Sequence, residues 1–377
     1  MTFRFIHTSD WHIAKPFRRF EPALAGELAA ARLGIVARIA DIARRQGAQH
    51  VVVAGDIFDS ELIATIDIRR ALARLAELSD LTWLLMPGNH DPARISGVWD
   101  QVVRIGAPAN VVVLDKAVPH ALGREAVLLP SPLTSKDPGR DITDWMDIAV
   151  TPPGVARIGL AHGSVRGFGS DDTAALRLAP DRAKRAGLSY LALGDWHGVE
   201  SVAQNTWYSG TPEPDQYPDN EPGYVLSVVL EEAKLATVEK LRSSEFTWVG
   251  MDRAIHSVAD LATVERDLEA SALSLGKTLV HLRLTGHLSL TERAALQSWR
   301  EVWSARLRFL DLDDKALAVN PEAADFEALG LTGQLLEAAR QLAAIGSDAD
   351  SPQQAHAATA LLRLAGFAAE ARHEAKP

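Results

Sequence analysis

Residues 50–59 read HVVVAGDIFD, a β-branched apolar run that gives way to glycine and two aspartates. β-branched residues favour strands, and glycine lets the backbone turn sharply where a strand ends. The pattern predicts a buried strand over His50–Ala54, followed by the loop Gly55-Asp56-Ile57-Phe58-Asp59. In layered α/β folds, ligands converge at the carboxyl ends of strands. The two carboxylates therefore point to a binding site.

Four more segments repeat this arrangement, because side chains that can bind a metal ion directly follow a predicted strand. They are Asp10-Trp11-His12, Gly88-Asn89-His90-Asp91, His162-Gly163 and Gly194-Asp195-Trp196-His197. A single segment is weak evidence for a metal site. Asp-x-His arises by chance, Gly-Asn-His-Asp can be a turn, and Asp59 can cap a helix. Five such segments in order, each at a strand end, favour one shared site.

Helical patterns alternate with these strands. Pro22–Gln46 places apolar residues at steps of three and four before Gly47, and Thr65–Leu78 repeats the pattern. This alternation predicts a layered α/β architecture with helices flanking sheets. Residues 207–242 then become mostly β, and they include a predicted hairpin. We therefore expect a first domain over residues 1–242.

The character of the chain changes near Ser243. Residues 243–377 hold strand candidates at 278–284 and 307–312 and several alanine-rich helices. Ser289-x-x-Glu292 is a capping box that opens one helix, and Ser351-Pro352 is expected to open the last one. We expect a smaller α+β domain with a helical C-terminus.

Composition sets limits on function. The 377 residues are 47% hydrophobic and 23% charged, as in ordinary globular proteins, which excludes a disordered tail, a collagen-like fibre and a coiled-coil rod. Net charge is −10, from 39 Lys+Arg and 49 Asp+Glu, so any polyanion must be held locally by basic residues or metal ions. The chain has no cysteine, which excludes thiolate metal sites and cysteine nucleophiles.

The sequence shows no membrane-spanning apolar stretch. Residues 1–7 also lack the pattern of a signal peptide. A cytoplasmic protein without membrane contact is the expectation.

Mixed carboxylate, imidazole and amide ligands suit divalent transition metals better than calcium. Phosphate ester cleavage by two cations roughly 3.5–4 Å apart needs one bridging carboxylate and further ligands on each side. The cations neutralise the phosphate and activate water. A histidine that is not a ligand can protonate the leaving oxygen. We expect two divalent ions, with manganese, iron, zinc or magnesium as the candidates.

The five segments together resemble the calcineurin-like metallophosphoesterase superfamily. Thr8-Ser9-Asp10-Trp11-His12, Gly55-Asp56-Ile57-Phe58-Asp59, and Tyr208-Ser209-Gly210-Thr211-Pro212 followed by Glu221-Pro222-Gly223-Tyr224 resemble its SbcD-type branch of DNA repair nucleases. The resemblance covers about residues 1–240. It implies a layered β-sandwich flanked by helices, a C-terminal capping domain, manganese-dependent exonuclease and endonuclease activity on DNA, and an SMC-like (SbcC-type) ATPase partner.

The resemblance also implies roles for single residues. Asp10, His12 and His197 would hold the first metal, and Asp56 would bridge to the second. The second metal would also be bound by Asn89, His162 and Asp195. His90 would be the non-ligand imidazole that assists the leaving group. Two carboxylates would orient these ligands, namely Asp59 and Asp91.

One position departs from the family pattern. The family has Gly-His-x-His where this chain has Gly194-Asp195-Trp196-His197. One hypothesis is that Asp195 still binds the second metal and favours harder ions such as manganese. The other is that Asp195 points away, so that the second metal is weak or lost.

Cations follow the ligand segments, and aromatic residues lie within or after them. The basic residues could contact phosphates or simply reflect the abundance of arginine; they are Lys15, Arg18, Arg19, Arg94 and Arg166. The aromatic side chains could stack on bases, although packing of their own loops is the more common use; they are Trp11, Phe17, Phe20 and Trp196.

Three functions stay open at this point. The first is a DNA nuclease, and the second is a phosphodiesterase or phosphatase acting on cyclic or dinucleotide substrates at the same site. The third is a scaffold whose metal site has decayed, which only Asp195 supports. The sequence also leaves open whether the chain forms a homodimer.

Overall fold

The chain divides into two units, Met1–Phe246 and Thr247–Pro377, and each has hydrophobic core clusters of its own. The computed structural model describes residues 2–165, 177–217, 220–232, 234–348 and 350–374. Among these residues, no helix is long and apolar enough to span a membrane.

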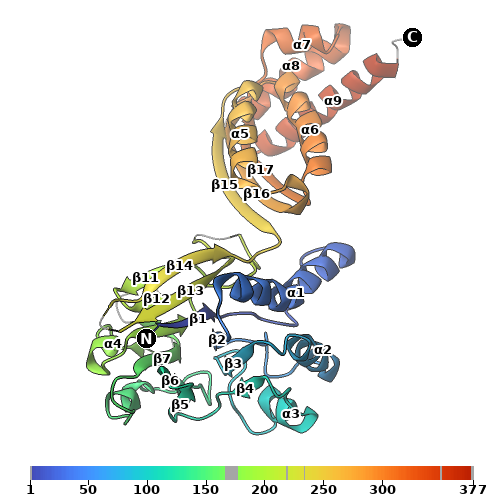
Figure 1. Cartoon of the computed structure of the whole chain (residues 1–377). Helices are drawn as coiled ribbons and strands as arrows, with labels where there is room; N and C mark the ends of the chain where they lie inside the picture. The colour runs from blue at the N-terminus through green and yellow to red at the C-terminus, as the bar shows by residue number, and fades with distance from the viewer. Residues whose placement is uncertain (1, 166–176, 218–219, 233, 349, 375–377) are drawn as a thin grey trace. The chain divides into compact units, whose positions relative to one another are not determined.

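Two sheets of six described strands each form the centre of the first unit (Figure 1). One has the order β14-β13-β1-β2-β3-β4 and comprises β1 (Thr2–Thr8), β2 (His50–Ala54), β3 (Thr82–Met86), β4 (Val111–Val113), β13 (Tyr224–Glu231) and β14 (Thr237–Arg242). The other has the order β11-β12-β10-β7-β6-β5 and comprises β5 (His120–Leu122), β6 (Ala126–Ser131), β7 (Ala156–His162), β10 (Tyr190–Gly194), β11 (Glu200–Ala203) and β12 (Thr206–Tyr208). A short pair, β8 (Ser164–Val165) and β9 (Arg177–Leu178), lies outside both sheets.

The two sheets pack face to face. Phe5, Val52 and Leu84 from the first sheet share a buried cluster with Leu160 and Tyr190 from the second. Alternating side chains point to opposite faces of a strand, so the other face of each sheet needs its own cover. This is the β-sandwich flanked by helices that the family resemblance implies.

Helices cover the outer face of the first sheet. They are α1 (Pro22–Gln46), α2 (Thr65–Ala76) and α3 (Val98–Ile105). Ile35 and Ile39 of α1 pack in one cluster with Trp83 of β3. The outer face of the second sheet is covered by the 3₁₀ turn Asp144–Asp147 and the short α4 (Arg182–Arg185). The helix predicted over Pro22–Gln46 is confirmed, and the short α3 was not predicted.

One buried carboxylate attaches residues 243–246 to the first unit. Glu213 accepts hydrogen bonds from the backbone N–H groups of Glu245 (2.7 Å) and Phe246 (3.0 Å). It also pairs with Arg38 at 2.6 Å. The first unit therefore extends beyond residue 242, where the composition of the chain changes.

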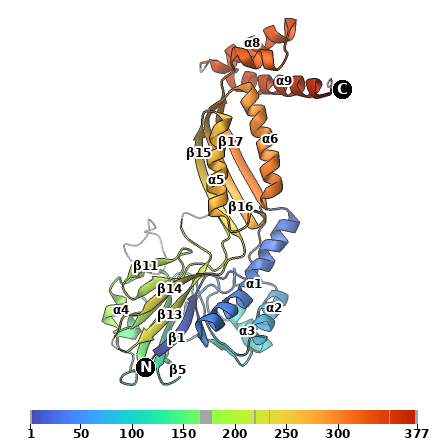
Figure 2. The same cartoon turned by 45° about the horizontal axis from the view of Figure 1, so that its top comes forward.

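The second unit is built on a parallel sheet of three described strands, β15 (Thr247–Ile255), β16 (Thr278–Leu288) and β17 (Phe309–Val319). Helices α5 (Leu261–Ser271) and α6 (Leu290–Arg306) join the strands and lie over one face of the sheet (Figures 1 and 2). Short 3₁₀ turns, Val258–Asp260 and Leu275–Lys277, flank α5. Three helices follow, α7 (Ala323–Ala328), α8 (Gly333–Ser347) and α9 (Gln354–Glu374).

The capping box at the start of α6 is confirmed, with the Ser289 side chain accepting from the backbone of Glu292. Strand β15 was not predicted, and it makes the sheet part of this unit an alternating β-α-β-α-β arrangement. The helical end agrees with the prediction.

Candidate metal centre

The five ligand segments meet at one edge of the sandwich. Strands β1, β2 and β3 run parallel in the first sheet, and β7 and β10 run parallel in the second. Strand β2 also contacts both β7 and β10 across the sandwich. Because the carboxyl ends of parallel strands share an edge, side chains far apart in sequence are brought together there.

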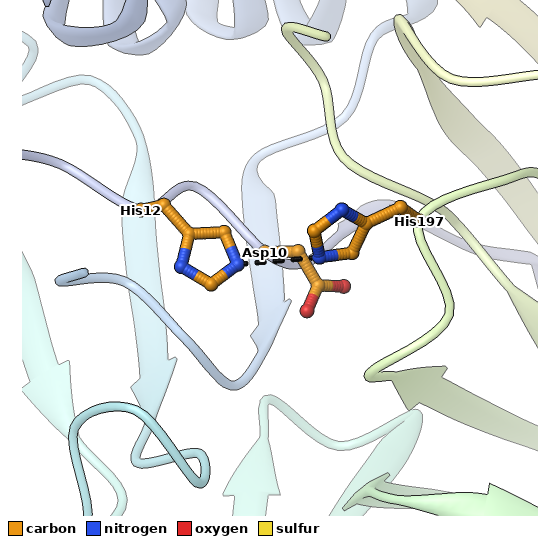
Figure 3. Close-up of side chains that lie close together, drawn as sticks. All are labelled: Asp10, His12 and His197. Atoms are coloured by element: carbon orange, nitrogen blue, oxygen red, sulfur yellow. Dashed lines mark hydrogen bonds between the residues drawn. The ribbon is translucent and has the colours of Figure 1, made fainter. Parts of the chain in front are cut away.

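One group of ligands comprises Asp10, His12 and His197, whose donor atoms lie within 4.8 Å of one another (Figure 3). The Nε2 atoms of the two imidazoles are 3.3 Å apart. Asp10 and His12 are buried after β1, while His197 is half-buried after β10. Two facing imidazole nitrogens beside a buried carboxylate suit a divalent transition metal.

A second group comprises Asp10, Asp56 and His162, again within 4.8 Å. Asp56 Oδ2 lies 3.4 Å from His162 Nε2 and 3.8 Å from His12 Nε2, so one carboxylate lies between the two groups. Asn89 Oδ1 lies 3.2 Å from His162 Nε2. The described residues thus place two adjacent ligand groups around Asp56.

Asp195 faces the second group. Its Oδ1 lies 3.8 Å from His162 Nε2 and 3.4 Å from Asn89 Nδ2. Its Oδ2 accepts a hydrogen bond from Ser164 Oγ at 3.1 Å. The carboxylate therefore points toward His162 and Asn89 rather than away from them.

His90 lies exposed beside both groups. Its ring is 4.8 Å from that of His12 in an edge-on arrangement, and it can share a third ligand group with His12 and Asp56. The ring Nδ1 lies 3.0 Å from the Asp59 carbonyl oxygen. Because Nδ1 can donate to that carbonyl, Nε2 is left to face solvent or substrate.

Polar contacts orient the ligands from behind. His162 Nδ1 donates to the Ala54 carbonyl at 2.8 Å, and its Nε2 faces Asp56 and Asn89. Asp59 Oδ1 lies 3.5 Å from His12 Nδ1. Asp91 is fully buried and accepts from the backbone N–H groups of Gly88 (2.7 Å) and Phe58 (3.0 Å), so it joins two ligand loops.

The ligand loops adopt a backbone conformation that is rare outside glycine. The φ angles are +53° at Asp10, +44° at His12, +55° at Asp56 and +98° at Asp195. Each such residue costs of order 1–3 kcal/mol, and such strain concentrates at functional sites. The surrounding hydrogen bonds hold these four side chains in place against that cost.

Two glycines give the ligands room. A Cβ at Gly55, where φ is +91°, would lie 2.3 Å from His162 Nδ1. A Cβ at Gly88 would lie 2.1 Å from Asp56 Oδ1. Any larger residue at either position must displace a ligand.

Burial and neighbouring charges shift the pKa values of these side chains in different directions. Burial raises the pKa of Asp10 to about 6, although His162 and His197 oppose the shift. Burial also favours a raised pKa at Asp56, but the nearby His162 and His12 outweigh it, so that carboxyl stays ionised. At His162 the carboxylates of Asp56, Asp10 and Asp195 outweigh burial and raise the pKa well above its usual value. The carboxylates therefore favour positive charge at this site, which divalent cations would supply.

Sequence reasoning missed a buried network behind His197. Asp215 and Arg32 are both buried, with side chains 1% exposed, and they lie 3.4 Å apart. Burial alone would raise the pKa of Asp215, but the charges of Arg32, His197 and Lys15 lower it below its usual value. Arg32 follows Leu28 by four residues within the apolar stripe of α1, and that position was the available signal.

The residues predicted to contact phosphate differ in their surroundings. Lys15 Nζ pairs with Asp215 at 2.5 Å, and Arg94 pairs with Glu61 at 3.2 Å. Arg18 and Arg19 are exposed, and the Arg19 guanidinium lies over an aromatic ring, that of Phe20. Arg166 lies outside the described residues.

Three of the four aromatic candidates are buried, namely Trp11, Phe17 and Phe20. Trp11 donates from Nε1 to Thr8 and packs edge-on against Trp83. These side chains pack their own loops, in agreement with the more common use, and are not available to stack on bases.

Residues 3–177 match the sequence model of the calcineurin-like phosphoesterase family. The match spans Asp10, Asp56, Asn89 and His162 and ends before the segment of His197. No curated protein was matched. The phosphoesterase family match implies metal-dependent hydrolysis of phosphoesters, and the Asp/His groups supply ligands for divalent ions. The mixed α/β fold is consistent with a metallophosphoesterase.

Proposed function

We propose that the chain is a two-metal phosphodiesterase that acts on DNA as a repair-type exonuclease and endonuclease. The observation that carries the proposal is the convergence of carboxylate, imidazole and amide ligands around Asp56, with His90 exposed beside them. When bound, the two ions would neutralise phosphate charge and activate a water. The ligands follow the arrangement of the two groups: Asp10, His12 and His197 for the first ion, Asp56 for both, and Asn89, His162 and Asp195 for the second.

His90 supplies the proton that the leaving oxygen needs. It is exposed, so a phosphodiester can reach it, and the Asp59 carbonyl fixes its ring through Nδ1. Its backbone N–H donates to Asp56 Oδ1 at 2.9 Å, which ties its position to the carboxylate between the metals. A protonated Nε2 then acts as general acid.

Asp195 favours a hard metal at the second site. The side chains there offer oxygens from Asp56, Asn89 and Asp195 and a single nitrogen from His162. Oxygen-rich sites suit manganese or magnesium better than softer ions. Manganese is therefore the proposed metal.

Counting bound manganese in Asp195→Ala and Asp195→His variants tests this assignment. We expect Asp195→Ala to lose the second ion and Asp195→His to retain two ions with increased zinc affinity. Two manganese ions bound with unchanged affinity in Asp195→Ala would remove Asp195 from the ligand set.

DNA as substrate is supported by the SbcD-like segments and by their place in the site. Thr211 Oγ1 donates to the Asp10 carbonyl at 2.7 Å, and Ser209 Oγ lies 2.8 Å from Ser9 Oγ. The segment thus supports the first ligand loop. Exposed Arg18 and Arg19 follow that loop and could contact the phosphate backbone.

A panel of metals and substrates tests the function. It covers linear and circular DNA, RNA, cyclic nucleotides and a chromogenic diester, each with manganese, iron, zinc and magnesium. We expect manganese-dependent DNA cleavage with salt-sensitive binding. Turnover restricted to small diesters would favour the nucleotide phosphodiesterase instead. Asp56→Asn is the control and should abolish every activity.

The same resemblance supports a capping role for the C-terminal domain, expected over residues 243–377, and an SMC-like ATPase partner. The partner is tested by mixing the purified chain and ATPase and measuring complex mass by light scattering, with and without the second unit, residues 247–377. The mass of the chain alone shows whether it is a homodimer. We expect a complex that needs the second unit.

A further inference from the structure

A buried carboxylate lies behind His197. Asp215 Oδ1 lies 3.8 Å from His197 Nδ1 and, among the residues that the structure describes, has no hydrogen-bond partner although it is buried. A buried acceptor without a donor is costly. A movement of less than about one ångström would bring the two atoms within hydrogen-bond distance.

Two cations anchor the other oxygen. Asp215 Oδ2 lies 2.5 Å from Lys15 Nζ and 3.4 Å from Arg32 Nη2. Arg32 is itself fixed, because it donates to the backbone carbonyls of Trp11 (2.5 Å) and Glu213 (2.7 Å). The carboxylate therefore cannot turn freely.

Arg32 also joins the two halves of the first ligand group. The carbonyl of Trp11 lies between the ligands Asp10 and His12 in the chain, and Asp215 lies behind the third ligand, His197. One buried guanidinium thus contacts both the loop after β1 and the carboxylate behind His197.

The other imidazole of this group has the same support. Asp59 Oδ1 lies 3.5 Å from His12 Nδ1, as Asp215 Oδ1 lies 3.8 Å from His197 Nδ1. Each ring thus has a carboxylate beside Nδ1 and its Nε2 facing the other ring at 3.3 Å. A carboxylate in this position fixes the tautomer and orientation of a metal-binding histidine.

We infer that Asp215, held by Arg32 and Lys15, is a positioning residue that keeps the His197 Nδ1–H directed away from the first metal and its Nε2 directed at it. The inference rests on the proposed metal site and adds a residue that no ligand motif contains. The competing role is structural, in which Asp215 is only the counter-ion of buried Arg32.

The test is a manganese titration of the full chain, with first- and second-site affinities separated by electron paramagnetic resonance. We expect Asp215→Ala to weaken the first site roughly 10–100-fold and the second by much less. Asp215→Asn keeps an acceptor for Nδ1–H and should lie between wild type and Asp215→Ala.

Glu213→Gln is the matched control. Glu213 is also buried and arginine-paired, but its side chain accepts from the backbone N–H groups of Glu245 and Phe246, and the substitution keeps the backbone carbonyl to which Arg32 donates. We expect Glu213→Gln to lower the unfolding temperature while both manganese affinities stay unchanged. If Asp215→Ala behaves in the same way, the role of Asp215 is structural and the inference is wrong.

Nitrogen-15 NMR of metal-free protein labelled at histidine gives a readout that does not need activity. We expect His197 to carry its proton on Nδ1 in wild type and to become a mixture of tautomers in Asp215→Ala. An identical tautomer in both proteins would overturn the inference. If wild type binds no manganese at all, the proposed function fails separately.

Discussion

At the scale of single residues, backbone contacts determine which ring nitrogen each histidine presents to the site. His162 donates Nδ1 to a backbone carbonyl, and His90 can do the same, so each ring presents Nε2. The difference between them is exposure, because His162 is fully buried among carboxylates and His90 faces solvent. This favours a ligand role for His162 and proton transfer for His90.

The role of His90 predicts separate effects on turnover and metal binding. We expect His90→Asn to lower kcat by roughly 10²–10⁴-fold, as for loss of a general acid, while two metal ions stay bound. Elemental analysis alongside kinetics checks this. His256→Asn, an exposed histidine of the second unit, is the control and should change neither quantity. Loss of an ion from His90→Asn would make His90 a ligand instead.

His7 predicts a pH dependence of stability. The residue is fully buried, with Nδ1 3.0 Å from Tyr190 Oη and Nε2 3.1 Å from the Leu193 carbonyl. Burial lowers its pKa to about 3, against 6.5 when unfolded. Below pH 6.5, His7 binds a proton in the unfolded chain but stays neutral in the folded chain. The free energy of unfolding therefore falls as the pH drops toward 3.

The slope should reach about 1.4 kcal/mol per pH unit. Urea unfolding of metal-free protein at pH 7, 6 and 5 measures it in wild type and His7→Gln. Raised carboxyl pKa values at Asp10 and Asp91 act in the opposite direction but are present in both proteins. We expect His7→Gln to be less stable at pH 7 and to lose less stability on acidification. Parallel curves would contradict this.

At the scale of elements, strand ends determine where the ligands lie. The loop after β3 passes so close to the loop after β2 that a Cβ at Gly88 would lie 2.1 Å from Asp56 Oδ1 and 2.5 Å from Asp56 N. Backbone cannot yield as a flexible side chain does. The spacing of these two loops therefore requires glycine.

Gly88→Ala should displace Asp56 and abolish binding of both metals. We also expect it to lower the free energy of unfolding by about 1–3 kcal/mol, because the clash is with a packed backbone. Gly26→Ala is the control, since its position in α1 is exposed with nothing within 4 Å of the added Cβ. It should stabilise the chain by roughly 0.5–1 kcal/mol. Metal binding by Gly88→Ala at wild-type affinity would contradict the argument.

Elements with a regular pattern could be predicted from sequence. The stripe over Pro22–Gln46 defines α1, and the ligand segments follow buried strands as expected. Strand β15 was not predicted because its buried residues, Trp248, Met251 and Ile255, do not recur at every second position as in a regular strand. Asp215 escaped because its partner Lys15 lies 200 residues away, and no local spacing signals such a contact.

At the scale of the whole molecule, the candidate ligands and the contacts that support them, as far as the structure describes the chain, belong to the first unit. The second unit has separate core clusters around Val280 and Leu361. A core that is complete within one unit is the requirement for independent folding. The first unit should therefore fold and bind metal without the second.

The end point of such a truncated chain decides its stability. Residues 1–246 should bind two manganese ions with the affinity of the full chain. Residues 1–242 lack Phe246, which is 1% exposed, and both N–H groups that Glu213 accepts. We expect the shorter chain to unfold at a temperature roughly 5–20 °C lower, because a buried aromatic and two hydrogen bonds to a buried carboxylate are lost. Scanning calorimetry with manganese titration compares them. If residues 1–246 fold but bind no metal, the second unit contributes to the site; equal unfolding temperatures would remove Glu213 as the link that holds residues 243–246.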